Sequence, residues 1–555
     1  MARRQAVFLL ALAFALGAMS SMASAAIVEH VFNVENVTVS KLCQDHVITA
    51  VNGSLPGPTI QVTEGDTLLV HVFNKSPYNV TIHWHGVFQL LSGWADGPSY
   101  ITQCPILPGD NYTYKFTITK QEGTLWWHAH VSFLRATVYG ALVILPKSGQ
   151  YPFPTPHEQF PIILGEWWNT NVIDLQNQAQ ALGTGPNNSD AYTINGMPGD
   201  LYPCSTNDSY MLNVAHGNTY MLRIINAALN NQLFFKIANH KFTVVAVDAS
   251  YTDPYVTDVA VLGPGQTVDV LLTTDQTPGA YYMAARPYFN AQNAPPPDNT
   301  TTTGILIYDE LPYTSPIMPL LPALNDTPTA HNFSSSLTSL VGSPNWRPVP
   351  TELDEQLLWT IGLGVSPCGP PNACTGVPIS HPPASANINN ASFQFPTSQS
   401  ILQAHFFNVT GIYTADLPDQ PPLKFDYTNP ANSNNTAFAF AFKSTRVKQV
   451  KYNATVEIVF QDTTIVGAEN HPMHLHGYNF HVKYNLFNPV IRNTIGVPVG
   501  GWATIRFQAN NPGAWILHCH LDAHLTMGLA TVIVVENGPT PLSTLPPPPP
   551  DLPQC

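Results

Sequence analysis

A seven-residue segment near the C-terminus places three histidines around one cysteine, in the order His518-Cys519-His520-Leu521-Asp522-Ala523-His524. Successive side chains of a β-strand point to opposite faces, so an extended chain over 515–520 would direct His518 and His520 to one face and Cys519 to the other. One thiolate could then bind a metal on one side while its neighbours bind other metals across the backbone. Such an arrangement can move electrons between two sites. Thiolate and imidazole together suit copper, zinc or iron.

Three further histidine clusters point to several metal ions. They are His83-Trp84-His85-Gly86, His128-Ala129-His130 and His471-Pro472-Met473-His474-Leu475-His476. One His-x-His pair alone is weak evidence, but four clusters hold half of the chain's 20 histidines. His471, Cys519 and His524 can form the two-histidine, one-cysteine site of blue copper. Eight histidines then remain for three more copper ions. Zinc is less suitable, because structural zinc sites close with four ligands.

The elements that must position these residues are short β-strands. Runs rich in Val, Ile, Phe, Tyr and Thr, bounded by Gly, Pro, Asn and Asp, predict strands. Examples are Thr67–Asn74, Tyr112–Thr119, Tyr220–Asn226, Thr243–Asp248, Thr267–Thr273, Thr455–Gln461 and Trp502–Gln508. Long amphipathic helical patterns are scarce. The sequence therefore predicts an all-β protein of Greek-key sandwiches or barrels.

Polar turns and biased segments indicate how the strands are grouped. Similar turns open three of the strands: Glu64-Gly65-Asp66-Thr67, His216-Gly217-Asn218-Thr219 and Pro264-Gly265-Gln266-Thr267. We expect the Pro- and Thr-rich stretches 146–158 and 311–350 to be linkers. The stretch 366–400 is expected to be an ordered but irregular connection.

The N-terminus predicts secretion. Arg3 and Arg4 precede the apolar run Val7–Ala18, which is too short to span a bilayer, and Ala23-Ser24-Ala25 fits a cleavage site. We expect a signal peptide over 1–25. The remaining chain has 19 Lys and Arg against 35 Asp and Glu, a net charge near −16, which argues against nucleic acid or an anionic membrane as partner.

Fourteen Asn-x-Ser/Thr sequons predict N-glycans on a secreted chain. They begin at Asn36, Asn52, Asn74, Asn79, Asn111, Asn187, Asn207, Asn299, Asn325, Asn332, Asn390, Asn408, Asn434 and Asn453. Six of the seven cysteines can pair, which leaves Cys519 as the odd one. An unpaired thiol in an oxidising compartment is a liability unless it binds a metal.

The histidine segments and their flanks resemble the four copper-binding regions of multicopper oxidases, and the resemblance is closest to plant laccases. It rests on the four clusters together with Trp94-Ala95-Asp96-Gly97-Pro98, Trp126-Trp127, Gly165-Glu166-Trp167-Trp168 and Gly538-Pro539-Thr540-Pro541. It implies three cupredoxin-like domains, at 26–148, 159–310 and 401–555, with a connection over 311–400. The first and third domains would share a copper cluster.

The resemblance also implies four copper ions per chain with a defined ligand set. The type 1 ligands would be His471, Cys519 and His524; the type 2 ligands, His83 and His474; the type 3 ligands, His85, His128 and His520 for one ion and His130, His476 and His518 for the other. The family's axial position is Leu529, which cannot coordinate, so the type 1 copper is expected to be three-coordinate. Met527 and Met473 are expected to pack.

Two acids and three disulfides complete the expected site and scaffold. Asp96 resembles the family's acid near the trinuclear cluster, where carboxylates can relay protons. Asp522 is predicted to orient an imidazole. By resemblance, the disulfides are Cys104–Cys555, Cys43–Cys204 and Cys368–Cys374.

The resulting interpretation is a secreted laccase, a benzenediol:oxygen oxidoreductase of the apoplast or cell wall. Phenols would give electrons to the protein through an exposed edge of His524. The family resemblance implies monolignols and lignin phenols as the substrates. Cys519 would pass them through His518 and His520, and dioxygen would become water. We expect a monomer. The alternatives are an ascorbate oxidase, a ferroxidase that would need carboxylates beside the type 1 histidine, and a non-enzymatic cell-wall protein of this fold.

One segment departs from the family pattern. After His481, Val482-Lys483-Tyr484-Asn485-Leu486 leads almost directly to Asn488-Pro489, where the family usually has a longer hairpin. The ligands before it are present. The shorter hairpin therefore leaves open how the strands pair next to the type 1 site.

Overall fold

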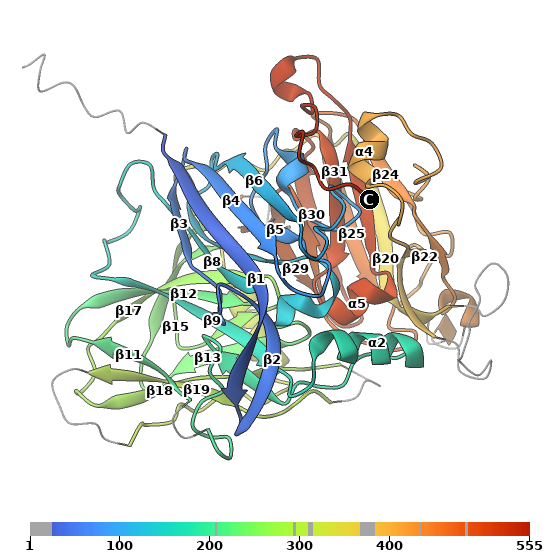
Figure 1. The fold of residues 1–555 in the computed structure, drawn as a ribbon. Coiled ribbons are helices and arrows are strands. Elements are labelled where there is room, and N and C mark those ends of the chain that lie inside the picture. Colours follow the sequence, from blue (N-terminus) through green and yellow to red (C-terminus); the bar gives the residue numbers. More distant parts are fainter. Residues whose placement is uncertain are drawn as a thin grey trace, which may run out of the picture.

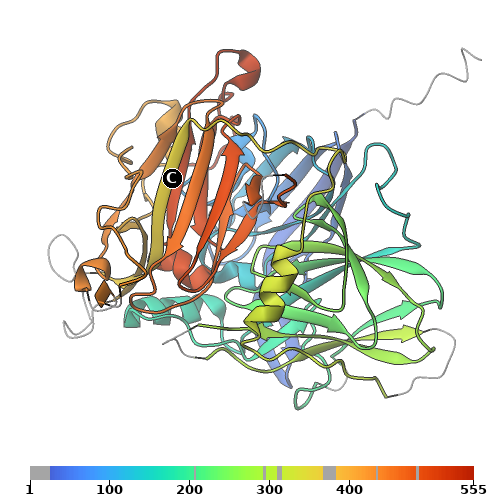
Figure 2. The same cartoon turned by 180° about the vertical axis from the view of Figure 1, so that it is seen from behind.

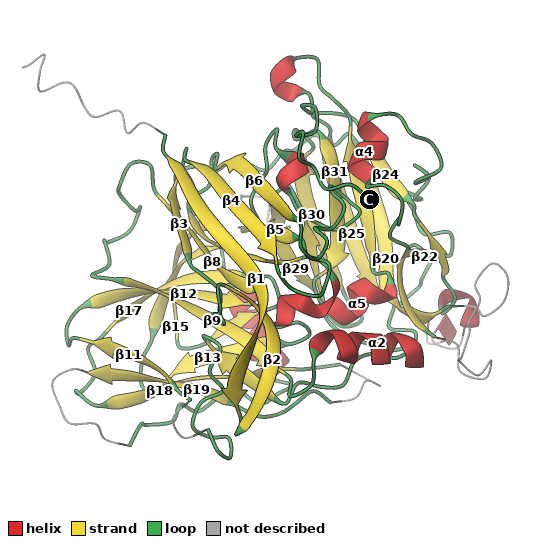
Figure 3. Ribbon diagram, in the orientation of Figure 1, coloured by secondary structure: helices red, strands yellow, loops and turns green. Residues whose placement is uncertain are grey.

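A computed structural model describes residues 25–205, 208–291, 296–308, 315–366, 383–429, 431–432, 435–482 and 487–555. All but the last residue of the expected signal peptide therefore lies outside the described residues. Strands dominate this part of the chain (Figure 3). They form three two-sheet domains, coloured blue, green and orange to red in Figure 1, which confirms the predicted cupredoxin-like fold. Within the described ranges, no helix is long and apolar enough to cross a membrane.

The first domain packs sheet β2-β1-β4-β6 on sheet β3-β8-β7-β5. Its elements are β1 (Ile27–Lys41), β2 (Gln44–Val51), β3 (Ile60–Thr63), β4 (Thr67–Asn74), β5 (Ile82–His85), η1 (Gly93–Ala95), β6 (Asn111–Thr117), β7 (Gly123–Ala129), η2 (Ser132–Ala136) and β8 (Tyr139–Leu145). Burial alternates along β6, so Tyr112, Tyr114 and Phe116 enter the core. In contrast, β5 and β7 are buried throughout, which keeps their histidines from water.

The second domain packs sheet β10-β9-β12-β17-β14-β15 on sheet β11-β19-β18-β13-β16. Its strands are β9 (Gln159–Trp167), β10 (Ala191–Ile194), β11 (Tyr210–Val214), β12 (Thr219–Asn226), β13 (Gln232–Ile237), β14 (Phe242–Val247), β15 (Ser250–Thr257), β16 (Ala260–Leu262), β17 (Thr267–Thr273), β18 (Ala280–Tyr288) and β19 (Thr302–Tyr308). Helix α2 (Val172–Leu182) begins after the Asn171 cap and ends at Gly183 with φ 66°. Helix α3 (Thr327–Ser335) lies over this domain when the molecule is seen from behind (Figure 2).

The third domain packs sheet β23-β22-β21-β20-β25-β30-β27-β28 on sheet β24-β32-β31-β26-β29. Its strands are β20 (Glu355–Val365), β21 (Ala384–Ile388), β22 (Ala391–Phe393), β23 (Phe442–Ser444), β24 (Val447–Val450), β25 (Thr455–Asp462), β26 (His471–Leu475), β27 (Phe480–Val482), β28 (Ile491–Arg492), β29 (Thr494–Val497), β30 (Trp502–Gln508), β31 (Gly513–Cys519) and β32 (Ala530–Val535). The helices are α4 (Ile401–Phe406), η4 (Thr436–Phe438), α5 (Asp522–Met527) and η5 (Pro541–Ser543).

The predicted strands are confirmed, but one connection is more regular than expected. Three strands, β4, β17 and β30, match their predicted ranges, and the other four shift slightly at their ends. The prediction of an irregular segment over 366–400 is wrong where it includes β21 and β22. Strand β21 pairs with β20 and β22 pairs with β21, while β20 pairs with the central β25 of the eight-stranded sheet, so main-chain pairing orders this segment. We therefore propose that the third domain starts at β20.

The three polar turns share one backbone feature. Gly65, Gly217 and Gly265 precede β4, β12 and β17, and their φ angles are 100°, 83° and 91°. A positive φ is easy for glycine and costly for other residues. The sequence similarity of these turns therefore has a conformational cause.

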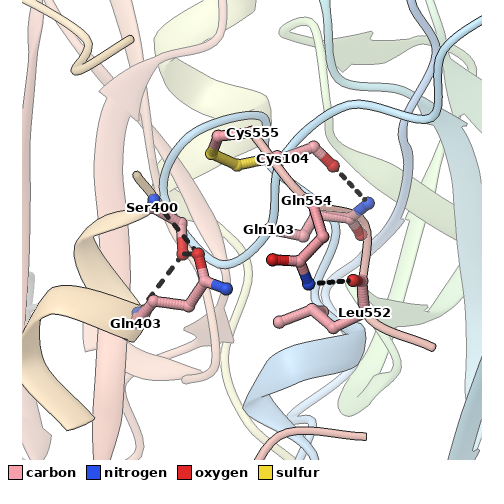
Figure 4. Close-up of a disulfide and its surroundings, with 7 residues drawn as sticks. All are labelled: Gln103, Cys104, Ser400, Gln403, Leu552, Gln554 and Cys555. Atoms are coloured by element: carbon pink, nitrogen blue, oxygen red, sulfur yellow. Dashed lines mark hydrogen bonds between the residues drawn. A yellow bond between two sulfur atoms is a disulfide. The ribbon is translucent and has the colours of Figure 1, made fainter. Parts of the chain in front are cut away.

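One of the predicted disulfides is confirmed. Cys104 of the first domain is bonded to Cys555, so the C-terminal tail is fixed beside the segment that contains Gln103 (Figure 4). The predicted pair of Cys43 and Cys204 is wrong: both thiols are free, and the Cys43 sulfur lies 3.1 Å from the Cys204 carbonyl oxygen. The predicted pair of Cys368 and Cys374 lies outside the described residues.

Strand pairing around the shortened segment is preserved. His481 of β27 pairs with Ile491 of β28 on one side and with Arg506 of β30 on the other. Residues 483–486 lie outside the described part of the chain. The third domain therefore keeps its sheet next to the candidate site.

Candidate metal centre

The type 1 group consists of His471, Cys519 and His524, which the fold brings together from β26, β31 and α5. Strands β26 and β31 are antiparallel neighbours, and Cys519 is paired with Met473. The Cys519 sulfur lies 3.8 Å from His471 Nδ1 and 3.5 Å from His524 Nδ1, and these two nitrogens are 3.1 Å apart. All three residues are buried. One sulfur and two nitrogens thus face a common point.

The charges in the type 1 group favour a thiolate. Burial opposes ionisation of Cys519, but the neighbouring His524 and His471 lower the pKa of its thiol to about 7. Burial would also lower the pKa of both imidazoles. The Asp462 carboxylate, 3.7 Å from His471 Nε2, and the Cys519 sulfur instead raise the pKa of His471 to about 10, and Cys519 raises that of His524 to about 9. A thiolate between two imidazoles is a set of ligands suited to copper.

The eight-histidine cluster lies between the first and third domains. His83 of β5 is paired with His128 of β7, and His474 of β26 with His518 of β31. His-x-His spacing puts the second member of each pair on the same side of its strand. The cluster divides into three groups whose ligand atoms lie within 4.8 Å of one another: His83, His85 and His474; His85, His128 and His520; and His130, His476 and His518.

The nitrogens of this cluster fit metal ions. Nε2 of His83, His128 and His474 has no hydrogen-bond partner among the described residues. His518 Nε2 lies 3.4 Å from His130 Nε2 and 3.2 Å from His476 Nε2, so ligand atoms face each other. Burial lowers the pKa of seven of these imidazoles, and to about 3 in His518. The rings are therefore neutral, and their lone pairs are available to copper.

Asp96 holds two of these histidines. Its Oδ2 accepts a hydrogen bond from His476 Nδ1 at 2.8 Å, and its main-chain oxygen accepts one from His83 Nδ1 at 2.8 Å. Burial raises the pKa of Asp96, while the nearby His83 lowers it. Bonds at Nδ1 leave Nε2 of both rings free to bind a metal.

Asp522 has a different partner from the one expected. Its Oδ2 accepts from Arg135 Nε at 3.0 Å, and no bond to an imidazole is found within the described part of the chain. Arg135 Nη2 donates to the main-chain oxygen of His520 at 2.9 Å. Asp522 therefore acts on the ligand segment through Arg135. Both line a cavity of about 240 Å³ that also borders His128, His130, His518 and His520.

The apolar neighbours of the type 1 group lie as expected. Met473 is buried in the core, and Met527 packs on the same core with its Cε 3.9 Å from the position of a Cβ on Gly185. Leu529 is fully buried, and its main-chain oxygen accepts from Cys519 N at 3.0 Å.

Three residues at the site, Glu469, Arg135 and Asn493, were not predicted from the sequence. Glu469 Oε2 lies 3.3 Å from His524 Nε2, so the exposed edge expected for His524 is covered, and His524 is only 4% exposed. The Glu469 side chain itself is 26% exposed. Its position two residues before His471 was the feature of the sequence that could have identified it. Nothing local distinguished Arg135 or Asn493, because their partners are far away in the sequence.

Comparisons with known proteins agree with this geometry. Three multicopper oxidase family models match residues 33–149, 158–311 and 416–539. Laccase-7 of Arabidopsis thaliana is 59% identical over 98% of this chain and 99% of its own length, and Laccase-24 of Oryza sativa subsp. japonica is 53% identical over 99% of both. The laccase of Botrytis aclada has a TM-score of 0.70 and 26% identity over 94% of this chain and 89% of that chain. Fet3p, a multicopper oxidase that functions in iron import, has a TM-score of 0.71 and 21% identity, with 92% and 90% covered.

Proposed function

Since this chain belongs to the multicopper oxidase family, we propose that it is a secreted laccase that oxidises phenols one electron at a time and reduces dioxygen to water. Copper, when bound, supplies one-electron acceptance at the type 1 group and dioxygen reduction at the eight-histidine cluster. The observation that carries the proposal is the segment 518–520. Cys519 belongs to the type 1 group, while His518 and His520 belong to two other ligand groups.

The peptide segment itself provides the electron path. Because β31 extends to Cys519 and alternates its side chains, two peptide bonds connect the thiolate to imidazoles on the other face. Hydrogen bonds keep this path rigid: His518 Nδ1 donates to Cys519 O at 2.9 Å, and Cys519 N donates to Leu529 O. The path is short, covalent and shielded from water.

The buried acids are placed to handle protons. Reduction of dioxygen to water consumes protons, and Asp96 is bonded to two ligand imidazoles. Asp522 lines the cavity of about 240 Å³ beside the cluster, where burial raises the pKa of its carboxyl group and the neighbouring Arg135 partly offsets that rise. The cavity is the route that we propose for dioxygen, and Asp522 the proton source along it.

A Cys519→Ser variant tests the electron path. It removes the sulfur ligand but keeps the shape of the side chain. We expect loss of the blue absorption and of phenol oxidation, with the eight-histidine cluster still binding copper. Phenol oxidation at the parent rate would contradict the proposal. A copper count near zero in the parent chain, prepared with copper in excess, would favour the non-enzymatic alternative.

Iron(II) oxidation is a second candidate activity, because Glu469 supplies a carboxylate beside the type 1 histidine. Carboxylate oxygens attract hard cations. Relative turnover of syringaldazine, ascorbate and Fe(II) separates the activities. Faster turnover of Fe(II) than of any phenol would favour the ferroxidase.

The finer assignments rest on the plant laccase relatives and the sequence. We propose monolignols and lignin phenols as substrates, the apoplast or cell wall as location, and a glycosylated monomer as the working form. Asn74 is an exception among the sequons. It is buried, and its Nδ2 donates to the main-chain oxygens of Tyr78 and Ile106, so it is unavailable to a glycan in the folded chain.

A further inference from the structure

The second domain provides none of the predicted ligands, yet two of its turns reach the eight-histidine cluster. One turn, at Asp248 and Ala249, connects β14 to β15. The other, over 263–266, connects β16 to β17. Both contact the segment 492–494 of the third domain. This contact points to a role for the second domain in holding the cluster.

Asn493 bonds to two ligands that serve different ions. Its main-chain oxygen lies 2.8 Å from His474 Nδ1, and its Oδ1 lies 3.1 Å from His85 Nε2. Both oxygens can only accept, so each imidazole must carry its proton at the bonded nitrogen. His474 Nε2 and His85 Nδ1 are then left with lone pairs. The first has no partner among the described residues, and the second faces His520 Nε2 at 3.1 Å.

Asp248 holds Asn493 in place from the second domain. Its Oδ2 accepts from the Asn493 main-chain N–H at 3.3 Å, and its Oδ1 forms an ion pair with Arg492 Nη1 at 3.2 Å. Its Oδ1 also accepts from Thr267 N at 2.9 Å, which anchors the carboxylate to β17. Asp248 is fully buried and Asn493 nearly so. A Cβ on Gly86 would collide with the Asn493 amide, so the space for this side chain depends on that glycine.

The second turn supports the same segment. Gln266 Nε2 donates to Thr494 O at 2.9 Å. A Cβ on Gly265 would lie 2.9 Å from His85 Cε1 and 3.0 Å from His520 Cδ2, so this turn packs directly on two ligand rings. The second domain thus contacts the cluster both by hydrogen bonds and by packing.

We infer that Asn493, held by Asp248, is a positioning residue that sets the tautomers of one type 2 ligand, His474, and one type 3 ligand, His85. The inference rests on the copper sites proposed above. The type 1 ligands make no hydrogen bond to Asn493 or Asp248 within the described residues. Loss of the contact should therefore weaken the cluster and spare the type 1 site.

The test compares copper retention in three full-length variants. Asp248→Asn removes the charge that pairs with Arg492. Asn493→Ala removes the nearer of two acceptors for His85 Nε2, the other being Thr494 Oγ1 at 3.2 Å, but keeps the main-chain oxygen for His474. Asp253→Asn is the matched control, because Asp253 lies in the same hairpin and accepts from Thr338 Oγ1 at 2.8 Å, away from the cluster. Copper-loaded protein is dialysed against a chelator, while metal content, type 1 absorption and the type 2 electron paramagnetic resonance signal are followed.

We expect Asp248→Asn to hold cluster copper about 10- to 100-fold more weakly than the parent, with type 1 absorption unchanged. Asn493→Ala should lose type 3 copper first and keep the type 2 signal longer, and Asp253→Asn should match the parent. If Asp248→Asn does not fold, the pattern in Asn493→Ala decides. Parental retention of cluster copper in the folded variants would overturn the inference alone. A parent that binds no copper would overturn the proposed function as well.

Discussion

The Glu469 carboxylate lies 3.3 Å from Nε2 of His524, at the ring nitrogen that does not face Cys519. Burial opposes ionisation of Glu469, but the bond and the charge of His524 hold its pKa below the usual value. A partly exposed negative charge therefore stands where electrons would enter the protein. This position lets Glu469 influence which reductants approach the type 1 site.

Replacement of Glu469 by Gln should change substrate preference. The variant keeps the shape and loses the charge, so attraction of Fe(II) should weaken by about 1 kcal/mol, which is about a fivefold rise in KM. Steady-state oxidation of Fe(II) and of an uncharged phenol measures the difference. Glu536→Gln is the control, since Glu536 bonds to Gln449 on the surface of the third domain. An equal change of KM for both substrates would argue against a charge effect.

Replacement of Asp96 by Asn should slow dioxygen reduction. The variant loses the carboxylate that accepts from His476 Nδ1, and an amide is a weaker acceptor for that bond. We expect kcat to fall about 10- to 100-fold, with type 1 absorption unchanged. Oxygen uptake under saturating phenol measures kcat. Asp66→Asn is a suitable control because Asp66 is a buried carboxylate that accepts from Ala26 N and Thr63 N, away from the metal centre. If both variants lose the same activity, the effect is one of folding.

The Cys104–Cys555 bond should stabilise the whole chain. It closes a loop with a sequence separation of 451, and crosslinks over long loops restrict the unfolded state most. Replacing both cysteines by serine should lower the free energy of unfolding by about 2–5 kcal/mol in denaturant titrations. The same change at Cys43 and Cys204 should leave it unaltered, because these thiols are free. Equal losses in the two double variants would mean that the second pair bonds as well.

The copper-free chain should lose stability as the pH falls below about 6.5. Burial lowers the pKa of His481 to about 4 and that of His518 to about 3 in the folded state. Between these values and 6.5 the unfolded chain binds more protons than the folded chain, so the free energy of unfolding decreases as the pH decreases. His471 and His524 have pKa values raised to about 10 and about 9. The stability that they contribute is therefore complete below about pH 6.5 and is lost as the pH rises through these values.

Thermal denaturation of the copper-free chain from pH 7 to pH 4 measures this effect. A His481→Gln variant should show a shallower decline, because one titrating group has been removed. His331→Gln provides the comparison, since His331 is an exposed residue of α3. A melting temperature that stays constant across this range would contradict the prediction.

The sequence by itself determined the ligand types, the strand architecture and the link between Cys519 and its neighbours. These features are local: His-x-His spacing and alternation follow from the geometry of one strand. The polar turns at Gly65, Gly217 and Gly265 were likewise visible, because a positive φ selects glycine wherever it occurs.

Only the tertiary structure decided the partners of the site. Asp248 meets Asn493 across 245 residues, and Arg135 meets Asp522 across 387. It also left Cys43 and Cys204 as two free thiols and placed β21 and β22 in the third domain's sheet. Such contacts depend on how buried surfaces of distant segments pack, and a hydrogen bond in that interior forms only where packing brings a donor to an acceptor. The spacing of residues along the sequence does not show which distant donors and acceptors will meet.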